Sequence, residues 1–146
     1  MLLLLIWCFG IFFPAIFHNA NAYLFSHIFL NKIYSIVCHQ QDSKSFFISS
    51  DKIEVCARCT GIYIGALIFS IPALLFPKLK PGSKKPLYIS MGIMAADIIL
   101  YTTGAYSYSK WTAFITGLIL GSVSILYIFA GLEEIFSESK INSNVQ

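Results

Sequence analysis

Three cysteines and one histidine are the residues of this chain whose types and spacing could do chemistry. Cys38 and His39 are adjacent, and Cys56 and Cys59 follow in a C-x-x-C spacing at the start of a long apolar run. Transition metals of the zinc or iron type favour thiolate and imidazole ligands, and two cysteines so spaced can bind one ion together. We therefore expect these four residues to hold a zinc or iron ion. Four nearby polar residues are expected to orient the ligands: Gln40, Lys44, Ser45 and Arg58.

Two other kinds of chemistry fit the same cysteines, and the sequence leaves the three alternatives open. Arg58 lies between Cys56 and Cys59, and Cys59 opens a predicted helix whose N-terminal dipole stabilises a thiolate. The pair could then exchange disulfides with Cys38, as in a membrane thiol–disulfide oxidoreductase. In an oxidising compartment the cysteines could instead form a structural disulfide. Catalysis is therefore not implied by the motif.

A carboxylate inside an apolar segment is the second candidate for function. Asp97 falls near the middle of residues 87–103, where an ionised carboxylate costs about 2.5–3.5 kcal/mol. Tyr101, one helical turn later, is expected to donate a hydrogen bond to it. Ion or proton handling, as in a small transport subunit, is the default hypothesis for such a residue. A buried hydrogen bond that fixes helix packing is the alternative, in a protein whose cysteines only brace a loop.

The composition indicates a membrane protein. Hydrophobic residues make up 57% of the 146 residues and charged residues only 12%, which is too apolar for a soluble domain of this size. A membrane-spanning helix needs roughly 17 to 25 predominantly apolar residues. Four stretches approach this length: 1–17, 59–76, 87–103 and 111–132. The sequence therefore predicts an all-α fold, an integral membrane bundle of four transmembrane helices in one domain, residues 1–136, followed by a polar tail, 137–146.

The connection between the first two predicted spans contains the expected site. Residues 22–38 carry apolar and aromatic side chains at helical spacing, which predicts an interfacial or re-entrant helix that ends near Cys38. Polar residues then interrupt the pattern. We expect residues 38–59 to form a cysteine and histidine loop at the face of the membrane.

The first predicted span could instead be a signal peptide, because Ala20-Asn21-Ala22 forms a small-x-small cleavage pattern after it. No lysine or arginine precedes the apolar run, so we interpret the segment as an uncleaved anchor. Cys8 within it is expected to behave as a small apolar residue.

Two pairs of glycines are expected to let helices approach each other closely. Gly61 and Gly65 are four residues apart in the second predicted span, and Gly117 and Gly121 repeat the spacing in the fourth. We interpret both pairs as packing sites within the chain. Self-association into a homo-oligomer is also compatible with a chain this small.

The distribution of positive charge indicates orientation and excludes one class of partner. The net charge is +3, but the lysines are scattered and form no basic, aromatic-interleaved face, so we expect the lipid bilayer and no nucleic acid as partner. The short loop between the second and third predicted spans is rich in lysine: Lys78, Lys80, Lys84 and Lys85. The positive-inside rule places this loop, and with it both termini, in the cytoplasm.

Two motifs carry a resemblance to a known family. The first is Cys38-His39-Gln40 with Lys44-Ser45-Phe46, and the second is Cys56-Ala57-Arg58-Cys59-Thr60-Gly61-Ile62-Tyr63-Ile64-Gly65. With them, the segment from Tyr23 to Gly121 resembles the domain of unknown function 2085 family (DUF2085), small predicted polytopic membrane proteins of prokaryotes. The resemblance implies a prokaryotic cytoplasmic membrane protein and supports the cysteine motifs. It implies no activity, because none is established for the family.

The chain departs from the family pattern at three positions. Lys44 stands where arginine is usual, Ile98 follows Asp97 where glycine is usual, and Ala113 replaces a common arginine. If that arginine normally pairs with the aspartate, the resemblance implies that Asp97 here lacks its partner and is neutral.

Overall fold

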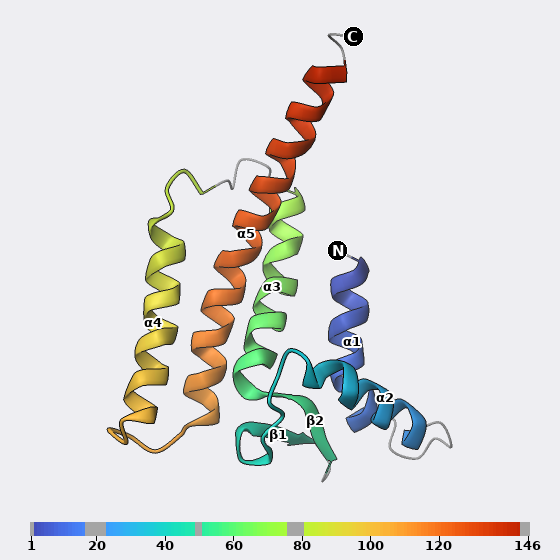
Figure 1. The fold of residues 1–146 in the computed structure, drawn as a ribbon, viewed down its shortest axis with the longest axis vertical. Helices are drawn as coiled ribbons and strands as arrows, with labels where there is room; N and C mark the ends of the chain where they lie inside the picture. Colours follow the sequence, from blue (N-terminus) through green and yellow to red (C-terminus); the bar gives the residue numbers. More distant parts are fainter. Residues whose placement is uncertain (1, 17–22, 49–50, 76–80, 144–146) are drawn as a thin grey trace.

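The computed structural model describes residues 2–16, 23–48, 51–75 and 81–143 (Figure 1). In these residues the chain forms five α helices, one short 3-10 helix and one two-stranded sheet. In chain order the elements are α1 (Leu2–Ile16), α2 (Tyr23–Ser35), the 3-10 helix η1 (Asp42–Lys44), β1 (Ser45–Ile48), β2 (Asp51–Cys56), α3 (Ala57–Leu75), α4 (Lys85–Thr102) and α5 (Lys110–Ser143).

The helices α4, α5, α3 and α1 lie side by side in this order (Figure 1). On one side α3 packs along α5, and α4 packs on the far side of α5 (Figure 1). On the other side α3 contacts α1, which in turn contacts α2 and β2. The small sheet and α2 lie beside the N-terminal end of α3 (Figure 1). The first turn of α3 is therefore the place where the helix row, the sheet and α2 meet.

Glycines form the contact between α3 and α5. Gly61 and Gly65 lie against the backbone of α5, and Gly117 and Gly121 lie against the backbone of α3 in return. At each position a Cβ atom would overlap a backbone oxygen of the facing helix, so only glycine permits this approach. The prediction that these glycines pack helices within the chain is confirmed. We call these four residues the glycine seam.

The β hairpin was not predicted, and it corrects the loop that was expected over residues 38–59. The strands β1 and β2 are antiparallel, with Ser45 opposite Cys56, and β2 runs directly into α3. Ile53 and Val55 of β2 are fully buried and pack in a core cluster with Ile11. This core anchors the hairpin between α1 and α2, and it fixes where the C-x-x-C begins.

The prediction of four transmembrane helices is wrong. In the described residues only two helical segments, Ala57–Leu75 and Lys110–Ile135, are long and apolar enough to cross a membrane. The described helix α1, Leu2–Ile16, is apolar but has 15 residues, about 22 Å against a hydrocarbon core of about 30 Å. The helix α4 has 18 residues, but Lys85 and Asp97 lie within it and lower its hydropathy.

Several predicted boundaries also shift. The expected interfacial helix, 22–38, is α2 and ends at Ser35, while most of the expected polar tail is helical, because α5 continues to Ser143. The cleavage pattern at residues 20–22 lies outside the described residues, as do Lys78 and Lys80.

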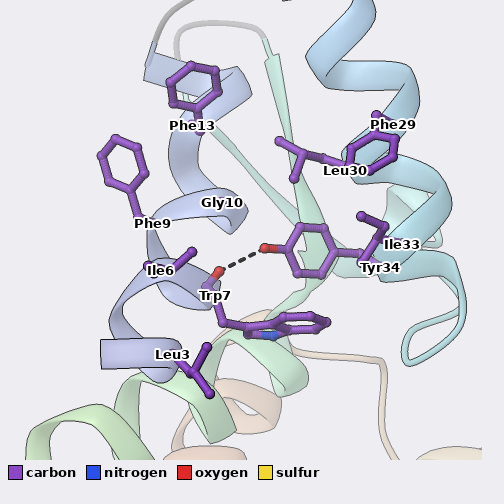
Figure 2. Close-up of a pocket in the computed structure, with 10 residues that line it drawn as sticks. All are labelled: Leu3, Ile6, Trp7, Phe9, Gly10, Phe13, Phe29, Leu30, Ile33 and Tyr34. Carbon is purple, nitrogen blue, oxygen red and sulfur yellow. Dashed lines mark hydrogen bonds between the residues drawn. The ribbon is translucent and has the colours of Figure 1, made fainter. Parts of the chain in front are cut away.

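An apolar groove separates α1 from α2. It has a volume of about 720 Å³, and its lining side chains, among them Ile6, Phe9, Phe29 and Leu30, are almost entirely hydrophobic (Figure 2). Within the described residues, a hydrogen bond joins the two helices, from the Tyr34 hydroxyl to the carbonyl oxygen of Trp7 at 2.7 Å (Figure 2). This bond lies beside the groove, which Trp7 and Tyr34 both line.

Candidate functional site

Cys38, Cys56 and Cys59 meet at the point where β2 becomes α3. Their three Sγ atoms all lie within 4.8 Å of one another, and all three residues are free thiols. Cys38 is buried and the other two are half-buried. A tetrahedral ion with bonds of 2.3 Å requires sulfurs about 3.8 Å apart, so the thiols would close by at most about 1 Å around a metal. We call these three residues the cysteine triad.

A strained backbone holds Cys38 in this position. Beyond the end of α2, the amide of Cys38 still donates a hydrogen bond to the carbonyl of Tyr34, at 2.9 Å. Gln40 follows with a φ of 48°, a left-handed conformation that is uncommon for any residue except glycine. Its side-chain amide donates to the carbonyls of Asn31 at 3.0 Å and Glu54 at 2.9 Å. Gln40 thereby ties the end of α2 to β2, and the chain reverses so that Cys38 faces the C-x-x-C.

Hydrogen bonds within the triad decide which sulfur ionises first. The thiols of Cys56 and Cys59 and the backbone amide of Cys56, at 3.2 Å, all bond to the Cys38 sulfur. These bonds lower the pKa of Cys38 well below that of an ordinary thiol, although burial opposes the shift. The hydrogen bond to Cys38 raises the pKa of Cys56 in return. Cys38 is therefore the residue of the triad whose hydrogen bonds favour the thiolate.

His39, which was expected as the fourth ligand, lies outside the triad. Its side chain is exposed, and neither ring nitrogen belongs to the group of potential ligand atoms. His39 does line the same cavity as the three cysteines. In the described residues the cluster therefore supplies three protein ligands rather than four.

The cavity beside the triad has a volume of about 300 Å³. All three cysteines line it. Its other polar lining residues are His39, Gln40, Gln41, Lys44 and Arg58, and its apolar ones are Val37, Ile62 and Met94. Three of the four residues expected to support the ligands, Gln40, Lys44 and Arg58, therefore line the site. The fourth, Ser45, is buried beneath it, and its hydroxyl donates to the Gln41 carbonyl at 3.0 Å.

Asp97 has a partner, and the expectation that it lacks one is wrong. Arg58, from the first turn of α3, forms an ion pair with the Asp97 carboxylate, and both side chains are largely buried. Tyr106, in the connection between α4 and α5, donates a hydrogen bond to the same carboxylate. This bond raises the pKa of Tyr106. Tyr101, the predicted donor, is not bonded to Asp97 but stacks edge-on against Tyr108 at a centroid distance of 5.2 Å.

Lys44 lines the cavity and also contacts the rings of Tyr101 and Tyr108. Its ammonium lies 4.9 Å from the ring centroid of Tyr101 and 5.6 Å from that of Tyr108. Burial raises the pKa of Tyr108 to about 12. Both rings present electron-rich faces to the cation. The aromatic pair therefore fixes a positive charge at the edge of the cavity.

Comparison with known proteins assigns the chain to a family. The family described as "Predicted membrane protein (DUF2085)" matches residues 38–127, more than half of the chain. The chain belongs to this DUF2085 family. An uncharacterised protein of Methanocaldococcus jannaschii is 37% identical over 120 residues, which cover 80% of this chain and 77% of that protein. An uncharacterised protein of Methanothermobacter thermautotrophicus is 39% identical over 41 residues, 28% of this chain and 37% of that protein. No solved structure matches the chain.

The matched segment of this membrane-protein family begins at Cys38 and contains the whole site. The cysteine triad, the Arg58–Asp97 ion pair and the glycine seam all fall inside residues 38–127, whereas α1 and α2 precede them. Sequence reasoning named Arg58 and Asp97 separately but did not pair them, and it missed Tyr106. An arginine at a helix start and an aspartate inside an apolar segment were the signal for that pair.

Proposed function

We propose that this DUF2085 protein binds one transition-metal ion, zinc or iron, through Cys38, Cys56 and Cys59. The observation that carries the proposal is the mutual approach of three free sulfurs at the edge of a polar cavity. A disulfide would need only two of them, and three sulfurs that all lie within 4.8 Å of one another match a metal's ligand set better. The preferred thiolate at Cys38 also favours metal binding, because a metal binds the deprotonated sulfur.

The Arg58–Asp97 pair supports this site rather than a transport function. An aspartate that carries ions or protons needs to change its charge or its partner, whereas Asp97 is paired with a buried guanidinium and a tyrosine hydroxyl. Arg58 lies between the two cysteines of the C-x-x-C. We therefore propose that the ion pair holds the first turn of α3 against α4 and so positions Cys56 and Cys59.

We further propose that the protein lies in the prokaryotic cytoplasmic membrane with the α3–α4 connection in the cytoplasm. Lys84 and Lys85 at the start of α4, beside the lysine-rich loop, support this orientation through the positive-inside rule. The cysteine triad lies at the opposite end of α3, and therefore at the other membrane face (Figure 1). An oxidising environment there would convert free thiols to disulfides, and a bound metal would prevent this oxidation.

The test is the metal content of the full-length protein, purified anaerobically in detergent without chelators and measured by elemental mass spectrometry. We expect close to one zinc or iron per chain, lost in Cys56→Ser. Cys8→Ser is the matched control, because Cys8 is also a buried free thiol but lies in α1, bonded to the Tyr63 carbonyl and outside the triad. It should retain the metal.

Two results would contradict the metal proposal. One is a wild-type protein without metal, and the other is a Cys56→Ser variant that keeps its metal. A Cys56–Cys59 disulfide that forms and is reduced in cells, with exchange abolished by serine at either position, would instead favour the thiol–disulfide oxidoreductase.

A further inference from the structure

The cavity beside the cysteine triad contains two cations and no carboxylate among its lining residues. Lys44 and Arg58 both line it, and every other polar lining residue is a neutral amide, a thiol or His39. Asp97 accepts a hydrogen bond from one nitrogen of the Arg58 guanidinium, but Asp97 itself does not line the cavity. A cavity of this charge is suited to an electron-rich group that accepts hydrogen bonds.

A buried donor at this cavity lacks an acceptor. The Nε–H group of Arg58 is buried, and within the described residues no atom accepts a hydrogen bond from it. A buried guanidinium donor without an acceptor costs free energy comparable to a lost charge-assisted hydrogen bond, so such groups are normally satisfied by water or by a ligand. Because Arg58 and Lys44 both line the cavity, the charges of this guanidinium and of the fixed ammonium favour an anion inside it.

The coordination of the triad is incomplete on the same side. Zinc and iron(II) in thiolate sites take four ligands, and structural sites obtain all four from the protein. Here three sulfurs line the cavity and His39 is not within ligand distance of them. The fourth position of an ion in the triad therefore opens toward the cavity. A site with three protein ligands and an open position is the arrangement that accepts an exogenous ligand.

We propose that the cavity binds a small anion whose donor atom completes the metal coordination and whose charge is held by Lys44 and Arg58. This inference rests on the proposed metal site and names what that site binds. The volume of about 300 Å³ equals roughly ten water molecules at about 30 Å³ each, which admits an inorganic anion or a small organic acid and excludes a peptide. The apolar side chains of Ile62 and Met94 leave room for a short hydrocarbon portion.

The experiment uses full-length protein in detergent, loaded with cobalt(II), with azide as the probe anion. A thiolate-to-cobalt charge-transfer band reports that the metal is bound, and the d–d bands report its coordination. We expect azide to shift the d–d bands of the wild-type protein while the charge-transfer band remains. His39→Ala should leave the starting spectrum unchanged, because the His39 ring nitrogens lie outside the group of potential ligand atoms.

Lysine variants separate a cavity charge from a general effect of removing a cation. Lys44→Met should keep the starting spectrum and weaken azide binding about tenfold, the loss of one charge-assisted hydrogen bond. Lys110→Met is the matched control, because its ammonium also lies over an aromatic ring, that of Phe47 at 5.2 Å, but it does not line the cavity. Azide affinity should not change in this variant.

The possible failures are distinguishable. An intact charge-transfer band with d–d bands that azide does not move would overturn the anion inference alone. A starting spectrum altered by His39→Ala would also overturn it, because His39 would then occupy the fourth position. A wild-type protein without any thiolate-to-cobalt band would overturn the metal proposal, and this inference with it.

Discussion

The two sides of α3 are packed in opposite ways. Toward α5, the glycine seam brings two backbones so close that no Cβ atom fits between them. Toward α1, a cavity of about 560 Å³ lies between the helices, and the groove of about 720 Å³ between α1 and α2 follows it (Figure 2). The tightly packed helices α3 and α5, with α4 linked to α3 by the Arg58–Asp97 ion pair, form what we call the frame, while α1 and α2 form a more loosely packed layer.

The cysteine triad lies on the boundary between the frame and this layer. Cys59 belongs to α3 and Cys56 directly precedes it, whereas Cys38 follows α2. Within the described residues, the hydrogen bond from the Cys8 thiol of α1 to the Tyr63 carbonyl of α3, at 3.7 Å, also crosses this boundary. A metal in the triad would therefore join the loose layer to the frame. Each prediction below tests this difference between the two sides.

The largest effect is expected from metal removal. With a chelator present, we expect backbone hydrogen exchange in residues 28–38 to rise strongly, because the metal is a covalent-strength link between α2 and the frame. Exchange across the glycine seam should change little. The measurement is hydrogen exchange by mass spectrometry in detergent, with the Cys56→Ser variant as control, in which the chelator should add nothing. An equal rise in both regions would show that the triad does not lie on such a boundary.

The buried ion pair of the frame should show the next largest effect. Asp97→Asn leaves the Arg58 guanidinium without its countercharge, and the Arg58 side chain is only 18% exposed. We therefore expect a loss of about 3–5 kcal/mol in the free energy of unfolding. Replacing both partners, as in Arg58→Met with Asp97→Leu, should cost less than Asp97→Asn alone. Denaturant titration in detergent, followed by circular dichroism, measures both.

A surface ion pair provides the control for this effect. Lys52 and Asp42 are 2.7 Å apart, but 80% of the Asp42 side chain is exposed, so Asp42→Asn should cost less than about 1 kcal/mol. If Asp97→Asn proved as mild as Asp42→Asn, the ion pair would not hold α3 against α4, and a role for Asp97 in ion handling would regain support.

The glycine seam offers a smaller and cleaner test. Gly121→Ala places a methyl group against the carbonyl of Ile62, and we expect a loss of about 1–3 kcal/mol in the free energy of unfolding from overpacking. Gly131→Ala is the matched control in the same helix, because a Cβ atom there meets nothing within 4 Å. Its higher helix propensity should make that variant neutral or slightly more stable. Equal effects at both positions would mean that the seam is not tightly packed.

Two features of the frame and its site were predictable from the sequence, the grouping of the cysteines and the packing of the glycines, and the reasons are local. The C-x-x-C with a third cysteine and the paired glycines are short patterns whose chemistry or packing follows from residue type and spacing. The same patterns identified the family, which the comparisons confirm. The triad thus follows from Cys38, Cys56 and Cys59 themselves, and only their mutual distance required the structure.

What the sequence did not predict depends on contacts between distant segments. Asp97 was assigned to Tyr101 because helical spacing makes that pair neighbours, but the turn after α4 brings Tyr106 to the carboxylate instead, and α3 brings Arg58. The hairpin was missed because Ser45–Ile48 is only four residues long and has no clear alternation. In the described residues the four-span prediction failed because α1 has 15 residues and because Lys85 and Asp97 lower the hydropathy of α4.

The smallest effect is expected in the loose layer itself. Phe9 lines both the groove between α1 and α2 and the cavity between α1 and α3, and its side chain is 57% exposed. Because few of its contacts are lost on truncation, Phe9→Ala should change the free energy of unfolding by less than about 1 kcal/mol despite the size of the ring.

Ile11 in the same helix is the matched control for Phe9. It is 1% exposed and belongs to the core cluster with Val55, so Ile11→Ala should cost about 2–5 kcal/mol. Denaturant titrations of both variants in the same detergent compare the two sites directly. We expect a clear difference between the two losses in the free energy of unfolding, because Ile11 packs against the hairpin whereas Phe9 faces the groove. Similar losses for both variants would show that α1 is packed as firmly as α5, and the contrast between the two sides of α3 would not hold.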